Sequence, residues 1–81
     1  MPKILFINGF SFFFYSNEGT ERIHIHVSKA DSLAKFWLDP EIELEYSEDF
    51  STRELRFIIE TLEEKRAFII EKWHEYFSRN T

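Results

Sequence analysis

The turns between its β-rich runs limit most strongly what this chain can fold into. Residues 1–47 contain five short β-rich runs, with the sequences KILFI, FSFFFYS, RIHIHVS, LAKFWL and EIELEYS. Between them stand Asn8-Gly9, NEGTE, KADS and Asp39-Pro40, all of which are typical of turns. Parallel strands need a crossover of roughly a dozen residues or more, and these connections are shorter. The runs therefore predict an antiparallel β-meander of four to five strands.

The remainder of the chain changes its periodicity and predicts one long helix. Ser51 followed by Glu54 forms a capping box, and Phe50 stands just before the cap. No glycine or proline follows as far as Ser78. The apolar positions fall on one stripe of a helix: Leu55, Ile59, Leu62, Ile69, Trp73 and Phe77. We predict a single α+β domain over residues 1–81, with strands in 1–47 and a C-terminal helix over about 51–78 that packs on one face of the sheet.

Alternation along the strands assigns side chains to the two faces of the sheet. The inward set is predicted to be Phe10, Phe12, Phe14, Ile23, Ile25, Val27, Ala34, Phe36, Leu38, Ile42, Leu44 and Tyr46. A single helix covers one face only, so the opposite face should be exposed. We name that surface the histidine face, and its predicted residues are Phe13, Tyr15, His24, His26, Lys35 and Trp37. Because solvated sheet faces usually carry Thr, Lys and Glu, this aromatic surface is a candidate binding site or subunit contact.

The predicted helix is longer than the sheet that it must cover. A straight helix of about 27 residues spans roughly 40 Å, whereas a five-residue strand spans about 17 Å. Arg66 interrupts the apolar stripe, and Phe57 and Phe68 lie on the side that should face water. Either an edge strand or the N-terminal strand wraps the helix, or its second half docks on a neighbouring subunit. With ten phenylalanines in the chain, we predict a homo-oligomer with contacts at Phe57 and Phe68.

Net charge and the absence of cysteine exclude several classes of function. The formal charge is −5 and there is no cysteine. Acidic domains bind phosphate backbones poorly, so nucleic-acid binding is not expected. Without cysteine there is no disulfide and no thiolate metal site. The segment MPKILFINGF does not resemble a signal peptide, and no apolar run reaches the roughly 20 residues of a membrane span. We predict a cytoplasmic protein with no membrane contact.

The two histidines leave several chemical alternatives open. His24 and His26 could hold one metal ion, with Glu43 or Glu45 as the third ligand. Either histidine could instead act as a general base beside Lys35 in a ribonuclease-type toxin. The aromatic residues around them could stack a base or hold a small ligand. The pair could also simply form hydrogen bonds on a polar face or pack at a subunit contact.

Several landmarks together resemble a family of small prokaryotic proteins, domain of unknown function 4160. They are the segments FFFYSNE, HIHV and AKFWLDP, the capped STREL and the terminal EKWHEYF. The resemblance implies one half of a two-gene pair, such as a toxin–antitoxin-type system. Family members commonly carry a histidine and two prolines before the histidine strand, whereas this chain has Gly19-Thr20-Glu21-Arg22-Ile23. The missing third histidine disfavours a metal site.

These observations favour a non-enzymatic interaction domain that self-associates and acts with a protein partner. The alternatives are a protein that binds a small ligand or nucleotide at the histidine face, and a metal-dependent enzyme or ribonuclease-type toxin that uses His24 and His26. We predict no cofactor and no resident metal, with His24 and His26 as the candidates if a metal were bound.

Overall fold

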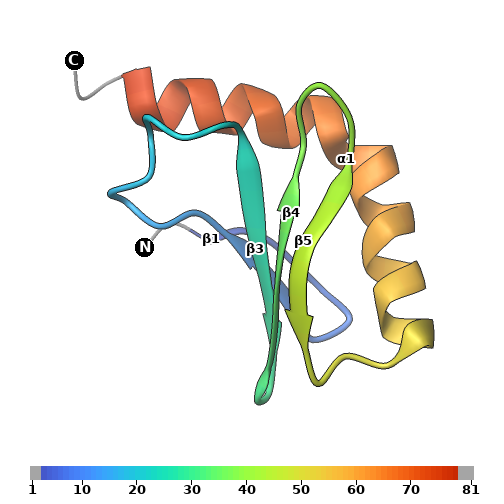
Figure 1. The fold of residues 1–81 in the computed structure, drawn as a ribbon. Helices are drawn as coiled ribbons and strands as arrows, with labels where there is room; N and C mark the ends of the chain where they lie inside the picture. The colour runs from blue at the N-terminus through green and yellow to red at the C-terminus, as the bar shows by residue number, and fades with distance from the viewer. Residues whose placement is uncertain (1–2, 79–81) are drawn as a thin grey trace.

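The computed structural model describes residues 3–78 as an antiparallel five-stranded sheet followed by one helix (Figure 1). The strands lie side by side in chain order, β1-β2-β3-β4-β5. Their bounds are Lys3–Ile7, Phe10–Phe13, His24–Lys29, Ser32–Trp37 and Glu43–Glu48, and helix α1 spans Thr52–Ser78. The predicted meander with one C-terminal helix is confirmed. Treating residues 1–81 as a single domain stays a prediction.

The turn and the helix cap that the sequence predicts are both present in the structure. Asn8 and Gly9 both have positive φ, 51° and 85°, which the tight turn between β1 and β2 requires. At the start of α1, the backbone N–H of Glu54 donates to Ser51 Oγ at 3.1 Å, and the backbone N–H of Ser51 donates to Glu54 Oε1 at 2.9 Å. These two reciprocal hydrogen bonds form the predicted capping box, and they satisfy two backbone N–H donors at the N-terminus of α1.

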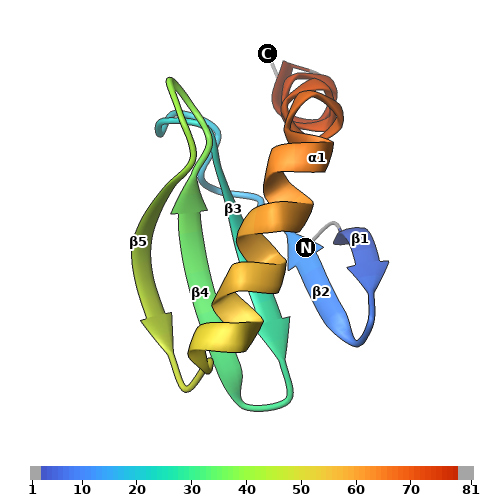
Figure 2. The same cartoon turned by 90° about the vertical axis from the view of Figure 1, so that its right-hand side faces the viewer.

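The core lies between α1 and one face of the sheet (Figure 2). The residues of β2, β3 and β4 buried there, with Phe14 and Leu38 directly after β2 and β4, are Phe10, Phe12, Phe14, Ile25, Val27, Ala34, Phe36 and Leu38, as the alternation predicted. Ile23 and Ile42 are half-buried and pack against them. From the helix come Ile58, Leu62, Ile69 and Trp73.

The fifth strand departs from the predicted pattern. Lys35 pairs with Tyr46 but Phe36 pairs with Leu44, so β5 has an extra residue opposite β4 at this point. A bulge of this kind reverses the alternation beyond it. The predicted inward position of Tyr46 is therefore wrong, because Tyr46 lies on the face of Lys35. Leu44 does share the inward face of Phe36, as predicted, but it is exposed because β5 is an edge strand.

Helix α1 bends near its middle instead of overhanging the sheet. The first half crosses the face of the sheet, and the second half turns to run across the end of the sheet (Figures 1 and 2). Near the bend, Thr61 Oγ1 donates to the carbonyl of Phe57 at 2.9 Å, a back-bond that commonly bends helices. Arg66 donates from Nε to the Leu38 carbonyl at 2.8 Å, which explains why a charge interrupts the apolar stripe.

The two predicted oligomer contacts lie in different surroundings. Phe57 was expected to face water, but it is half-buried and its ring centroid lies 5.1 Å from that of Phe10. It also lines a hollow of about 250 Å³ together with Ile7, Glu60, Thr61 and Glu64. Phe68 is 40% exposed, as expected. Contact of either residue with another copy of the chain stays a prediction.

Candidate functional site

The six residues predicted for the histidine face do lie together. Pairing of β2, β3 and β4 aligns Phe13, His26 and Lys35 in one cross-strand row. His24 pairs with Trp37, and their ring centroids are 5.6 Å apart. The ring of Tyr15 meets the edge of His26 at 4.4 Å between centroids. One continuous cluster of rings therefore surrounds the two imidazoles.

The imidazoles are nevertheless buried, and their predicted exposure is wrong. His24 is 0% exposed and His26 is 2% exposed. The connection between β2 and β3 (residues 14–23), which we name the β2–β3 loop, reaches over them and carries Glu18. The second half of α1 adds Trp73, whose ring lies 5.1 Å from that of His24. Alternation along a strand indicates which face a side chain takes, but not which distant segment covers that face.

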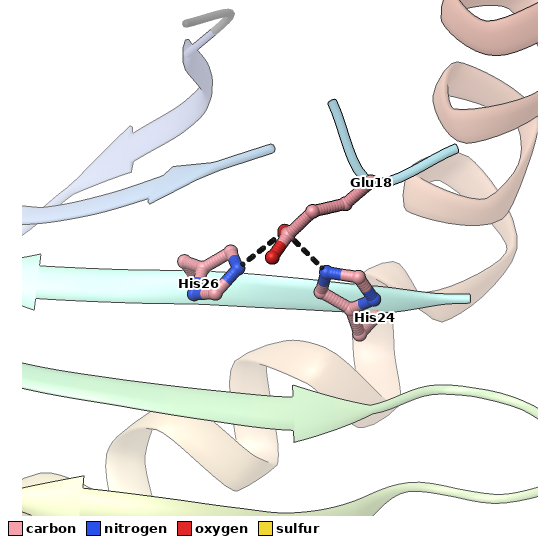
Figure 3. Close-up of side chains that lie close together, drawn as sticks. All are labelled: Glu18, His24 and His26. Atoms are coloured by element: carbon pink, nitrogen blue, oxygen red, sulfur yellow. Dashed lines mark hydrogen bonds and ion pairs between the residues drawn. The ribbon is translucent and has the colours of Figure 1, made fainter. Parts of the chain in front are cut away.

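Glu18 joins the two histidines through a single oxygen atom (Figure 3). Its Oε1 lies 2.7 Å from Nε2 of His24 and 2.9 Å from Nε2 of His26. Nδ1 of His24 lies 2.8 Å from the carbonyl oxygen of Arg22, which can only accept, so this nitrogen donates. The ring of His24 is therefore held on both sides, by the Arg22 carbonyl at Nδ1 and by the Glu18 carboxyl group at Nε2.

Among the described residues, the His26 side chain has one hydrogen-bond partner, Glu18. Within residues 3–78, its Nδ1 is buried and has no partner. Burial lowers the pKa of His26 below its ordinary value, although the hydrogen bond with Glu18 opposes this shift. Burial tends to raise the pKa of Glu18, but the hydrogen bonds from His24 and His26 and their charge outweigh it, so the pKa is lowered. Both shifts favour an ionised Glu18 beside a neutral His26.

Charged side chains around the two histidines form ion pairs and hydrogen bonds with other residues. Lys35 Nζ lies 3.3 Å from a carboxylate oxygen of Glu21 and 4.4 Å from the ring centroid of Trp37. The indole N–H of Trp37 donates to Glu45 at 2.9 Å. Glu43 pairs with Arg22 at 3.1 Å. The structure thus pairs both proposed third ligands, Glu43 and Glu45, with other side chains.

Two members of the site were missed in the sequence. Glu18 stands in the polar segment NEGTE, which indicates a turn and says nothing of where a side chain reaches. Trp73 was assigned to the core stripe of a straight helix, and only the bend of α1 brings it to His24. His74, next to Trp73, is exposed.

One family model matches the chain, and it covers residues 9–74, which include the strands β2 to β5 and most of α1. Its description is domain of unknown function (DUF4160). No curated protein and no solved structure matches the chain at a significant level. With most of its length matched, including Glu18, His24 and His26, the chain belongs to the DUF4160 family of domains of unknown function.

Proposed function

We propose that this chain is a non-enzymatic interaction domain that self-associates and pairs with a second protein. The proposal is carried by apolar surface that remains exposed on the face of the sheet opposite the core. Phe6 on β1 is 63% exposed, and Tyr15 and Tyr46 are exposed on the same side. Isolated exposed apolar residues are ordinary, but several on one sheet face are typical of an interaction site.

Strand pairing defines the part of this face that the β2–β3 loop leaves open. Phe6 pairs with Ser11, Ser11 with Ser28, and Ser28 with Leu33. These four residues, which we name the open row, are uncharged, and the row is flanked by Lys3, whose ammonium lies 5.1 Å from the ring centroid of Phe6, and by Glu48, which pairs with Leu33. Low charge together with an exposed aromatic residue suits the centre of a protein–protein interface. We assign the second protein to the open row.

Self-association is assigned to the outer side of α1. Phe68 is 40% exposed, with the ammonium of Lys72 5.4 Å from its ring centroid. Phe57 lines the hollow beside Ile7, so apolar surface occurs on both halves of the helix. A second copy could cover either position. The partner itself would be the other half of a two-protein system of the toxin–antitoxin type, as the family resemblance implies.

The alternatives receive less support from the geometry. Stacking of a base or an organic ligand on the imidazoles requires exposed ring faces, whereas both rings are buried. A ribonuclease would need a basic surface, whereas Lys35 is paired with Glu21 and the net charge is −5. No helix within residues 3–78 is long and apolar enough to span a membrane. A cytoplasmic location stays a prediction.

Reciprocal variants test the two assignments separately. Phe6→Glu should abolish co-purification of the partner from the native host without changing the mass of the chain's own assembly. Phe68→Glu should lower that mass and leave co-purification intact. Ala67→Glu, which adds the same charge at an exposed neighbouring position, is the control for Phe68→Glu. Wild-type behaviour of both glutamate variants at Phe6 and Phe68 would refute the proposed function.

A further inference from the structure

We propose that Glu18, His24 and His26 form a binding site for one divalent transition-metal ion, with Zn²⁺ as the reference ion. The inference does not depend on the interaction function proposed above. It starts from the convergence of three ligand atoms of suitable chemistry. Oε1 of Glu18 and one ring nitrogen from each histidine all lie within 4.8 Å of one another. Two imidazoles and one carboxylate are a ligand set that suits zinc and other divalent metals of the first transition row.

The spacing of these atoms leaves room for an ion after a small adjustment. Ligand atoms about 2.0–2.2 Å from a zinc ion in tetrahedral geometry are roughly 3.3–3.5 Å from one another. Glu18 Oε1 is now 2.7 Å and 2.9 Å from the two Nε2 atoms, at hydrogen-bond distance. Coordination of one ion would therefore require Glu18 Oε1 to move away from both Nε2 atoms. Glu18 stands on a loop, whereas the histidines stand on a central strand, so the loop residue is the one that can adjust.

The hydrogen bond at Nδ1 of His24 prepares the other ring nitrogen for coordination. Nδ1 donates to the Arg22 carbonyl at 2.8 Å, which fixes the orientation of the ring. In the neutral ring, Nε2 then carries the lone pair and points toward Glu18. Metal-binding histidines are typically held in this way, by a carbonyl or a carboxylate on the nitrogen opposite the metal. The Arg22 carbonyl would therefore hold His24 in the orientation that metal binding requires.

The burial of His26 needs an explanation that packing does not provide. Its ring is stacked on Phe13 and meets the edge of Tyr15, so an apolar residue would also fill this position. The histidine instead leaves Nδ1 buried without a partner within residues 3–78, which costs free energy. Its one polar contact is Glu18 Oε1, at the proposed ion position. Metal binding by Nε2 would give this buried histidine a role that an apolar residue could not fill.

Aromatic side chains enclose the three ligands and would keep water away from most of the ion. His24 contacts both Trp37 and Trp73, and His26 contacts Phe13 and Tyr15. Glu18 is only partly buried, so access is from the side of the β2–β3 loop. Three protein ligands leave at least one coordination position for water or for a group from another molecule. An ion at this position would also fasten the β2–β3 loop to the sheet.

A charge-removing substitution on the loop tests the site with little risk to the fold. Glu18→Gln keeps the size of the side chain and removes the anionic ligand. Glu21→Gln is the matched control, because Glu21 is on the same loop but pairs with Lys35. His74→Ala controls for zinc bound by the exposed histidine of α1. Circular dichroism of each variant establishes that the fold is intact.

Each protein is stripped with a chelator, dialysed and titrated with Zn²⁺ by calorimetry, and Co²⁺ absorption spectra report the ligand geometry. We expect one ion per chain in the wild type, in Glu21→Gln and in His74→Ala, and affinity reduced by about tenfold or more in Glu18→Gln. Zinc should also raise the melting temperature of the wild type, because it binds the folded chain preferentially. The proposal is overturned if the stripped wild type binds no zinc, or if Glu18→Gln binds zinc as the wild type does.

Discussion

The ring of His24 lies 5.1 Å from the ring of Trp73, centroid to centroid, in an edge-to-face arrangement. This contact joins the third strand to the second half of a helix whose first half covers the opposite face of the same sheet. Trp73 also meets Phe14 edge-to-face at 5.2 Å, so a single indole reaches both the core and the histidine cluster. The bend of α1 makes this double contact possible.

Truncating that indole should strongly destabilise the fold. Trp73→Ala removes a side chain that is 4% exposed, and we expect a loss of about 3–5 kcal/mol in the free energy of unfolding. Urea denaturation followed by circular dichroism measures the loss. Phe68→Ala, at an exposed position of the same half-helix, should change the stability by less than about 1 kcal/mol. Similar losses for the two variants would contradict the described packing of the second half-helix.

A methyl group at Gly19 should disturb the loop that carries Glu18. A Cβ atom built at Gly19 would lie 2.4 Å from Cδ1 of Phe77, well inside van der Waals contact. We expect Gly19→Ala to cost about 1–3 kcal/mol and to speed amide hydrogen exchange in residues 14–23. Ser16→Ala on the same loop is the control. Combining Gly19→Ala with Phe77→Leu should restore part of the loss, and a clash located elsewhere would show no such rescue.

Arg66 should contribute to stability although it is a charged residue in the middle of an apolar stripe. Besides Nε, its guanidinium donates from a terminal nitrogen to the Pro40 carbonyl at 3.1 Å. Arg66→Met keeps the aliphatic bulk but removes both donors, and we expect a loss of about 1–2 kcal/mol in unfolding free energy. Arg56→Met, at an exposed position of α1, should have little effect. Equal stability of the two methionine variants would argue against the observed contacts.

Acidification should destabilise the metal-free protein in two stages. The pKa of His26 is lowered in the fold, so the unfolded chain takes up more protons, and stability falls as the pH drops below about 6.5. The pKa of Glu18 is also lowered in the fold, so the free energy of unfolding continues to fall as the pH drops below about 4.5. Burial is the main cause of the lowered pKa of His26, Glu18 opposes it, and His24 and Lys35 are the other titratable neighbours that act on it.

Urea denaturation at a series of pH values, with a chelator present, measures this dependence. His26→Gln should flatten the first stage, whereas His74→Gln should leave the profile unchanged. A wild type that gains stability between about pH 7 and pH 5 would have the opposite sign from that required by a buried neutral histidine.

Short-range patterns were sufficient to predict most of the fold. The Asn8-Gly9 turn, the alternation through Ile25 and Val27, and the Ser51–Glu54 cap each act over a few residues, and each is present in the structure. The bulge opposite Lys35 was not predictable, because the sequence EIELEYS alternates without a break.

The candidate site was predicted only in part, because its closure depends on long-range contacts. The histidines and their aromatic neighbours share one face by strand alternation, which the sequence displays. Glu18 reaches them from a loop, and Trp73 reaches them because the helix bends. Neither the position of the loop nor the bend of the helix produces a periodic pattern in the sequence. The sequence therefore indicated an open surface where the structure has a buried cluster.

Light scattering of the purified chain from low to high micromolar concentration tests the proposed self-associating interaction domain most directly. We expect a mass that rises with concentration to at least twice the monomer mass of 9.9 kDa. Phe68→Glu should stay near the monomer mass while Ala67→Glu follows the wild type. A wild-type mass of 9.9 kDa that does not change over the whole range would contradict self-association.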